Sequence, residues 1–333
     1  MDTAEHPFAP FIRILGKGPR TARHLSRDEA REAGRLIFAD AVEPVQLGAF
    51  LCLLRLRGET PEELAGLAEA ARASLLKPAN PPQVALDWPS YAGKRDRLPW
   101  FLLAALLLAR DGHAVLLHGE DSHTPGRIST APALRSLGVP PAGSLEEAAE
   151  RLRAGNIAFL PLAALSPHLH AILGLKPLLG LRNPFHSVAR ALNPLSASAQ
   201  IVGVAHPAYR TLHRDAGALL GQPRMAVLKG DGGEAERRPA KPCPVAMLAD
   251  GVASEETWAP LSSGATPEGE AEPREIGALA ALWRGSIASP GAEAAVAGTA
   301  AIALKLLGRA ATMEEAEDVA LRLWRQRDRR LDA

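Results

Sequence analysis

Closely spaced prolines at residues 77–82, which read Lys-Pro-Ala-Asn-Pro-Pro, set the strongest limit on the fold of this chain. Proline has no backbone N–H and a fixed φ, so such a run blocks both a helix interior and a central strand. Apolar residues recur at helical intervals before the run and form strand-like segments after it. The sequence therefore predicts two domains, a helical domain of residues 1–78 and an α/β domain of residues 79–333.

Start signals place the helices of the first domain. Ser26 precedes Glu29 by three residues, the spacing of a capping box, which predicts a helix from there to about residue 38. A second helix is expected at residues 45–56, where apolar residues recur with a helical period. Thr60 followed by proline and two glutamates predicts a third helix start.

Strand and helix patterns alternate beyond the prolines, which is typical of a parallel sheet. The expected strands are residues 84–87, 114–118, 157–160, 200–204 and 224–228, with a helix at 99–110 and closing helices near 275–285 and 291–330. Residues 255–272, rich in Glu, Ser, Gly, Thr and Pro, are expected to form an exposed excursion. Apolar residues make up 47% of the chain and aromatic residues only 4%, which favours a core of close-packed helices.

The net charge and the cysteine content restrict the classes of function that this chain can have. A net charge of +1 argues against a protein held to nucleic acid by its overall charge, so that only a local patch would bind it. Cys52 and Cys243 lack the spacing of a zinc site or disulfide framework. The acidic N-terminus differs from an export signal, and the longest apolar stretch, 98–109, is well short of the roughly 20 residues that span a bilayer. We expect a soluble cytoplasmic protein with no membrane partner.

Two segments carry a resemblance to a known family. The first segment comprises residues 46–51, which read Gln-Leu-Gly-Ala-Phe-Leu, and residues 54–66, which read Leu-Arg-Leu-Arg-Gly-Glu-Thr-Pro-Glu-Glu-Leu-Ala-Gly. Residues 181–194 read Leu-Arg-Asn-Pro-Phe-His-Ser-Val-Ala-Arg-Ala-Leu-Asn-Pro. Both resemble the anthranilate phosphoribosyltransferase and nucleoside phosphorylase superfamily, glycosyltransferase family 3. The resemblance implies a small N-terminal helical domain plus a large α/β domain with a central, mostly parallel sheet, assembled as a homodimer through the helical lobes.

The phosphate-binding loop of that family is altered here. Active members hold phosphoribosyl pyrophosphate on a Gly-Thr-Gly-Gly-Asp loop, whose glycines let backbone N–H groups approach the phosphates. Residues 87–97 instead read Asp-Trp-Pro-Ser-Tyr-Ala-Gly-Lys-Arg-Asp-Arg. Gly93 is the single glycine, Pro89 lacks an N–H, and Trp88 and Tyr91 are expected to fill the space of the phosphates. The resemblance therefore implies a degenerate enzyme with no catalytic residues.

Remnants of the ligand cleft surround this loop. The family motif Lys-His-Gly-Asn-Arg is matched by Leu-His-Gly-Glu-Asp at residues 117–121, so that acids face the place of an anion. Arg127 could restore some positive charge, whereas Arg182 is either a remnant of an anion site or a residue that caps and packs. The residues that the resemblance assigns to the degenerate cleft are Tyr91, Gly93, His118, Gly119, Arg127 and Arg182.

The acidic pair that binds magnesium in the family is also incomplete. Residues 229–236 read Lys-Gly-Asp-Gly-Gly-Glu-Ala-Glu, in which Ala235 replaces one carboxylate. Asp231, Glu234 and Glu236 could form a different site, with Glu234 as the metal ligand. A polar turn whose acids lie in solvent is the favoured interpretation. We therefore expect no cofactor, and magnesium is the alternative.

The pattern as a whole resembles a divergent YbiB-type branch that binds nucleic acid without sequence preference. The basic residues that the resemblance assigns to this role are Arg13, Lys17, Arg20, Arg23, Arg27, Lys94, Arg95, Arg97, Arg322 and Arg325. A solvated helix end is the more common outcome for the last two. We therefore expect a degenerate transferase-fold homodimer that binds nucleic acid. The alternative is an active phosphoribosyltransferase that uses phosphoribosyl pyrophosphate, or another anionic ligand, in the altered cleft.

Overall fold

A computed structural model describes residues 5–18, 20–95, 97–120, 126–230, 232–261 and 273–331. The N-terminal helices are α1 (Ala9–Gly16), α2 (Arg27–Phe38), α3 (Pro44–Arg57) and α4 (Pro61–Ala73). The expected caps are confirmed, since Ser26 and Glu29 form a reciprocal capping box at α2, and Thr60 and Glu63 form another at α4. These local bonds satisfy N–H groups that a helix start leaves without intrahelical partners.

A mostly parallel sheet forms the centre of the larger lobe. Its strands are β1 (Leu86–Ser90), β2 (Val115–Gly119), β3 (Ile157–Pro161), β4 (Ala199–Val204), β5 (Arg224–Lys229), β6 (Cys243–Ala249) and β7 (Val252–Trp258). Among the described residues, the strand order is β3-β2-β1-β4-β5-β6-β7, and β6 pairs antiparallel with both of its neighbours. This confirms the predicted fold class, a small helical domain with an α/β domain. The carboxyl ends of β1, β2, β4 and β5 consequently lie along one edge.

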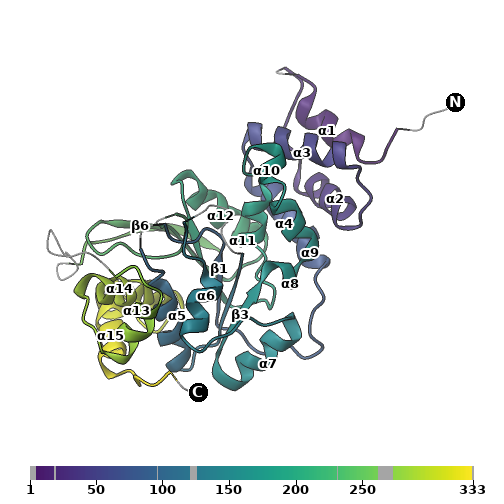
Figure 1. Ribbon diagram of the computed structural model, residues 1–333. Helices are drawn as coiled ribbons and strands as arrows, with labels where there is room; N and C mark the ends of the chain where they lie inside the picture. Colours follow the sequence, from purple (N-terminus) through teal and green to yellow (C-terminus); the bar gives the residue numbers. More distant parts are fainter. Residues whose placement is uncertain are drawn as a thin grey trace.

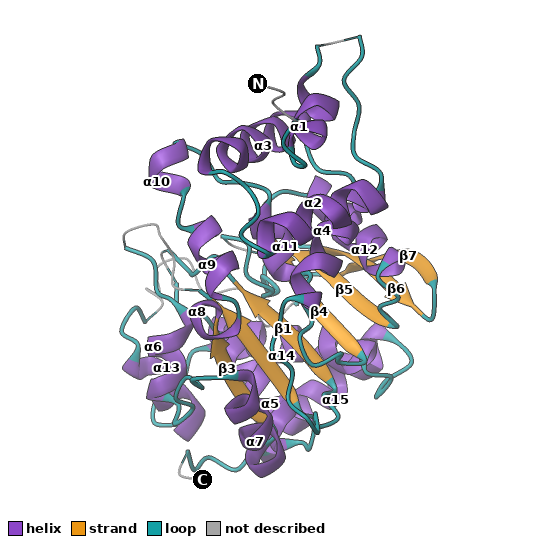
Figure 2. Ribbon diagram, turned by 90° about the vertical axis from the view of Figure 1, so that its right-hand side faces the viewer, coloured by secondary structure: helices purple, strands orange, loops and turns teal. Residues whose placement is uncertain are grey.

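Helices cover both faces of the sheet (Figure 2). One face packs against α5 (Phe101–Arg110), α6 (Thr130–Ser136), α13 (Gly277–Arg284), α14 (Pro290–Leu306) and α15 (Met313–Gln326). The other face packs against α7 (Leu145–Gly155), α8 (Leu162–Leu165), α11 (Phe185–Arg190) and α12 (Ala208–Leu219). Two short helices, α9 (Pro167–Leu173) and α10 (Lys176–Leu179), lie between α8 and α11 in the sequence. The helical lobe shares the second core, because α4 contacts both α11 and α12.

The lobe at the top of Figure 1 draws on segments far apart in the sequence, since α9, α10 and α11 lie beside α1–α4. The core that fills it likewise joins Phe50 of α3 to Phe185 of α11. The boundary at residue 78 remains a prediction. Within the part of the chain that the structure describes, no helix is long and apolar enough to cross a membrane.

Two expectations are wrong in the C-terminal third. Residues 255–258 belong to β7, paired with β6, rather than to an exposed excursion, while 262–272 lie outside the described residues. The helix expected at 291–330 is two helices, because Gly308 has a positive φ of 74° and Thr312 caps a new start at α15. The sequence analysis does not predict strand β6, whose hairpin partner β7 overlaps the expected excursion.

Candidate functional site

The loop that follows β1 holds a buried carboxylate. The backbone N–H groups of Ala92 and Gly93 both donate to Oε1 of Glu234, each at 2.7 Å. Glu234 is 0% exposed and comes from the segment after β5. Two consecutive amides that point at one oxygen form a small anion-binding concavity. The loop therefore binds an anion that belongs to the chain itself, and we call residues 91–94 the closed loop.

A second carboxylate continues this arrangement. Glu236 accepts hydrogen bonds from Nζ of Lys94 at 2.7 Å and from the N–H of Phe101, the first residue of α5, at 2.9 Å. Lys94 is only 1% exposed, so the expectation that it lies on a basic surface is wrong. A buried ammonium is tolerated because a buried carboxylate neutralises it. Glu236 also satisfies an N–H at a helix start, where the helix dipole favours negative charge.

Glycines allow the acidic segment to approach the sheet this closely. A Cβ at Gly230 would lie 1.4 Å from the carbonyl oxygen of Glu234, and a Cβ at Gly203 would lie 2.2 Å from the backbone nitrogen of Ala235. Real side chains do not fit in such spaces. The turn at 230–236 is thus shaped to place its carboxylates under the closed loop.

Arg127 fixes the closed loop from the outside. Its Nη1 donates to the carbonyl oxygens of Ala92 and Gly93, at 3.0 and 3.1 Å. The backbones of Lys94 and Ile128 also exchange two hydrogen bonds, at 2.9 and 2.7 Å. Arg127 therefore binds the carbonyl side of the loop, while Glu234 binds its N–H side.

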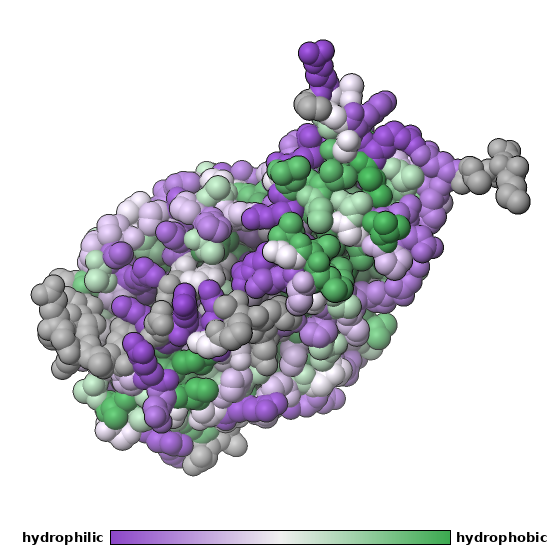
Figure 3. All heavy atoms as spheres, turned by 45° about the horizontal axis from the view of Figure 1, so that its top comes forward, coloured by the Kyte–Doolittle hydropathy of each residue, from purple (hydrophilic) through white to green (hydrophobic). Residues whose placement is uncertain are grey.

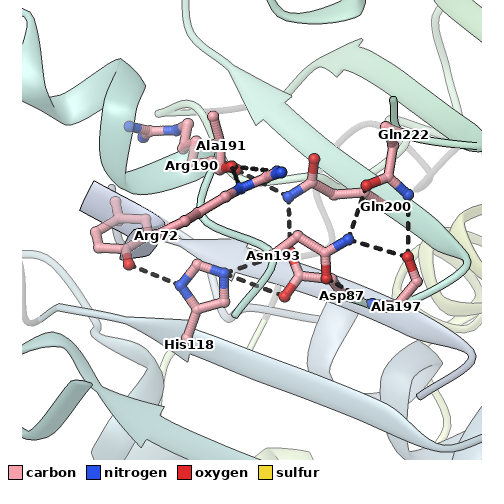
Figure 4. A network of polar contacts seen from close by, with 10 residues as sticks. Arg72, Asp87, His118, Arg190, Ala191, Asn193, Ala197, Gln200 and Gln222 are labelled. Atoms are coloured by element: carbon pink, nitrogen blue, oxygen red, sulfur yellow. Dashed lines mark hydrogen bonds and ion pairs between the residues drawn. The ribbon is translucent and has the colours of Figure 1, made fainter. Parts of the chain in front are cut away.

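A buried polar network lies behind the closed loop (Figure 4). The hydroxyl of Tyr91 lies 2.7 Å from Nδ1 of His118, whose Nε2 lies 3.3 Å from Asp87. Gln200 donates to the same carboxylate at 2.7 Å. Burial, with the nearby Asp87 charge, raises the pKa of Tyr91 well above its ordinary value. His118 thus has partners on both ring nitrogens within the protein.

Other cleft residues have structural roles. A Cβ at Gly119 would lie 1.8 Å from the carbonyl oxygen of Ser90, so β1 and β2 need a glycine there. Tyr91 is buried under the guanidinium of Arg190, whose carbon lies 5.6 Å from the ring centre. The expectation that Trp88 fills space in the cleft is wrong. Its ring stacks on Phe101 of α5, because alternate residues of a strand face opposite sides of the sheet.

The contacts of Glu236 do not favour a magnesium ion, because its carboxylate lies 2.7 Å from a lysine ammonium, which would repel a cation. Glu234 uses Oε1 for two amides, while its Oε2 has no hydrogen-bond partner among the described residues. The assignment of Glu234 as a metal ligand stays a prediction. Asp231 lies outside the described residues, and those described contain no group of three or more His, Cys, Asp or Glu that could hold a metal.

A pocket of about 120 Å³ lies at the junction of the two lobes, and Arg190 in its lining also lies over the Tyr91 ring of the closed loop. Its lining includes Arg55, Arg182, Arg190 and His206, with Glu59 as its acidic member. Burial lowers the pKa of Arg182, and the neighbouring Arg127 charge adds to the effect. Burial also lowers the pKa of Arg190. The pocket therefore has a surplus of desolvated positive charge, which favours an anionic ligand.

The remaining basic candidates lie at separate places on the surface. Exposed side chains include Arg13, Lys17, Arg20 and Arg23 near α1, Arg95 and Arg97 after the closed loop, and Arg322 and Arg325 on α15. Several near α1 are neutralised: Arg13 pairs with Glu5, Arg23 with Glu29, and the half-buried Arg27 with Glu69. Helices α1 and α15 lie at opposite ends of the molecule (Figure 1). The clusters on α1 and α15 are therefore far apart in a single chain.

Sequence reasoning placed Glu234 and Glu236 on a polar turn or at a metal and missed their contacts with the closed loop. The available signal was two acids one residue apart after a glycine-rich turn, opposite a loop whose amides need an acceptor. Their pairing with Lys94 and Phe101 required the fold, since more than 130 residues separate the partners.

Comparisons with known proteins agree over most of the chain. The family model "Glycosyl transferase family, helical bundle domain" matches residues 9–75. An anthranilate phosphoribosyltransferase of Methylocella silvestris is 30% identical over 309 residues, which cover 91% of this chain and 87% of that protein. The "Uncharacterized protein YbiB" of Escherichia coli is 29% identical, with 73% and 76% covered. The crystal structure of the Thermus thermophilus anthranilate phosphoribosyltransferase superposes with a TM-score of 0.79 at 25% identity, covering 96% and 94%.

Proposed function

Because this chain belongs to the anthranilate phosphoribosyltransferase-like family, we propose that it keeps the family's fold, has lost phosphoribosyl transfer, and binds nucleic acid without sequence preference as a homodimer. The observation that carries the loss of transfer is the occupied loop. Both amides that point into the loop, those of Ala92 and Gly93, already donate to Glu234. An incoming diphosphate would meet a buried carboxylate of the same charge, and like charges at short range in a partly buried site repel by several kcal/mol.

Ligand-dependent stabilisation tests the loss of transfer. A ligand that binds only the folded state raises the melting temperature by mass action. We expect no rise for the wild-type protein with millimolar phosphoribosyl pyrophosphate and magnesium, and no phosphoribosyl transfer to anthranilate. A clear rise, or measurable turnover, would contradict the proposal.

Nucleic-acid binding is supported by exposed cations that lack an ion pair among the described residues. Lys17 and Arg20 stand beyond the end of α1, and Arg95 follows the closed loop. Such residues bind phosphates by releasing counterions, so the affinity should fall steeply with salt and depend little on sequence. We expect binding to a random oligonucleotide at micromolar protein and about 50 mM salt.

A charge-removal series separates this surface from the far end of the molecule. We expect the double variant Lys17→Ala and Arg20→Ala to weaken binding and to reduce the salt slope by about 2, one for each phosphate contact. The matched control is the double variant Arg322→Ala and Arg325→Ala on α15, which should bind more tightly than the first. Wild-type protein that fails to shift the oligonucleotide at low salt would refute this part of the proposal.

A homodimer is supported by an apolar surface on the helical lobe. Val45 and Leu56 of α3 are 79% and 84% exposed, and Leu178 of α10 is 83% exposed. Figure 3 shows hydrophobic residues gathered on this lobe. Apolar patches of this kind mark interaction sites, and a second copy of the chain would cover this one. In sedimentation experiments, we expect Leu56→Asp to yield monomers, whereas Val252→Asp on β7 stays dimeric. A monomeric wild type would exclude the dimer.

The arginine-lined pocket favours a second candidate function, the binding of a different anionic ligand, or residual transfer in the altered cleft. Arg182 has no ion pair among the described residues, and both its burial and the charge of Arg127 lower its pKa. An aromatic carboxylate or a nucleotide would offset that charge. We expect anthranilate or a nucleoside monophosphate to raise the melting temperature of the wild type and not that of Arg182→Gln. Equal shifts in both proteins would exclude the pocket.

A further inference from the structure

Residues 92–101 present four hydrogen-bond donors to a buried space. These are the N–H groups of Ala92, Gly93 and Phe101 and the ammonium of Lys94. Consecutive loop amides, a helix N-terminus and a lysine are each elements of protein anion sites. Here all of them face Glu234 and Glu236, two acids separated by a single residue. The donors therefore bind two negative groups held at a fixed spacing.

Both carboxyl groups that meet these donors are buried. Glu234 is 0% exposed and Glu236 is 4% exposed. Burying an ionised carboxylate is unfavourable unless opposite charge and hydrogen bonds compensate. For Glu236, the compensation includes the positive charge on Lys94. For Glu234, it comes from the two loop amides and from the nearby Arg190, whose pKa the Glu234 charge in turn acts to raise.

We infer that Ala92, Gly93, Lys94 and Phe101 still form an anion-binding site, and that Glu234 and Glu236 fill it from within the chain as two phosphate groups of a diphosphate would. Glu234 is the residue that closes the site to external phosphates. This inference rests on the proposed function, in which the wild-type loop takes no external diphosphate. It adds that the loop keeps its capacity to bind an anion, which the chain itself now uses.

Glu234 is the residue to change. Removal of Glu236 would leave the Lys94 ammonium buried without its partner, which destabilises the fold for a separate reason. Removal of Glu234 leaves two neutral amides without an acceptor beside an opened space. An external phosphate can supply that acceptor. The Glu234→Ala protein should therefore be less stable than the wild type and regain stability when inorganic pyrophosphate is added.

A matched control exists in the helical lobe. Glu63 is also 0% exposed and accepts two backbone hydrogen bonds, from Leu25 and Thr60, at 2.9 Å each. It lies at the start of α4, outside the closed loop and the turn that fills it. Glu63→Ala should lose stability as well, but pyrophosphate should not restore it. The comparison separates a refilled anion site from general stabilisation by a polyvalent salt.

The experiment measures melting temperature and calorimetric binding of inorganic pyrophosphate for the wild type, Glu234→Ala and Glu63→Ala. We expect pyrophosphate to bind Glu234→Ala at least about tenfold more tightly than the other two. If Glu234→Ala does not fold, Glu234→Ser opens the same space while keeping a small polar side chain, and pyrophosphate must then stabilise it relative to the wild type. Absence of any gain in the variant that folds overturns this inference alone. Tight binding by the wild type instead overturns the proposed function.

Discussion

The variant Trp88→Ala tests whether the Trp88 ring packs between the sheet and α5 or occupies the cleft. The Trp88 ring is 0% exposed and stacks on Phe101, with the ring centres 5.9 Å apart. A buried aromatic side chain removes about 150–250 Å² from water, so at about 25 cal/mol per Å² its loss removes roughly 4–6 kcal/mol of transfer free energy. Partial collapse of the cavity reduces this, and we expect the free energy of unfolding to fall by about 4 kcal/mol.

Urea unfolding measures the loss, and pyrophosphate titration measures any new binding. We expect Trp88→Ala to gain no pyrophosphate affinity, because the indole lies on the α5 face and the loop amides stay paired with Glu234. Trp88→Phe is the control. It keeps a stacked ring and removes an indole N–H that has no acceptor among the described residues, so it should cost well under half as much. Pyrophosphate binding by Trp88→Ala with Glu234 intact would refute this reasoning.

Three further predictions address stability. Burial and the Arg190 charge lower the pKa of His213 from 6.5 to about 3, so the unfolded chain takes up the proton at a higher pH than the folded chain does. The free energy of unfolding should therefore fall by up to about 1.4 kcal/mol per pH unit as the pH drops from 6.5 towards 3. Urea unfolding of His213→Gln should lack this contribution to the pH dependence. Gly66→Ala places a Cβ 2.2 Å from the Arg27 carbonyl oxygen, where α4 packs on α2, and should cost about 1–3 kcal/mol by the same assay. Tyr209→Phe removes a hydroxyl that donates to Glu59 across the lobes and should cost about 1 kcal/mol; an unchanged unfolding midpoint would show that the contact contributes nothing.

Local signals in the sequence predict many of the helix starts and strands of the fold. The capping boxes at Ser26 and Thr60 act within four residues, so the chain around them specifies the helix starts without help from distant parts. The five parallel strands were located within two or three residues because buried strands are continuous apolar runs. The sequence does not predict the β6–β7 hairpin, because β7 has an exposed, polar pattern and forms a strand only through its pairing with β6.

The candidate site was only partly accessible to the same reasoning. The altered loop does follow the first strand of the sheet, whereas the expectation that Tyr91 fills the space of the phosphates stays a prediction. Lys94 was taken for a surface cation, because a lysine among arginines in a polar loop gives no sign of burial. Its partner Glu236 lies 142 residues away, and a buried pair of that separation has no local pattern.

The sequence by itself determined that the chain folds as a helical lobe on a parallel sheet and that the loop after β1 lacks the glycines of a phosphate cradle, because helix caps, strand periods and missing glycines are local properties. Only the tertiary structure decided what fills the loop instead. In the sheet, β4 lies between β1 and β5, and Gly203 and Gly230 let the turn after β5 approach closely enough for Glu234 to meet the amides of Ala92 and Gly93. Hydrogen bonds and charges act over a few ångströms, so the partner of a buried donor is set by which segments the fold brings together.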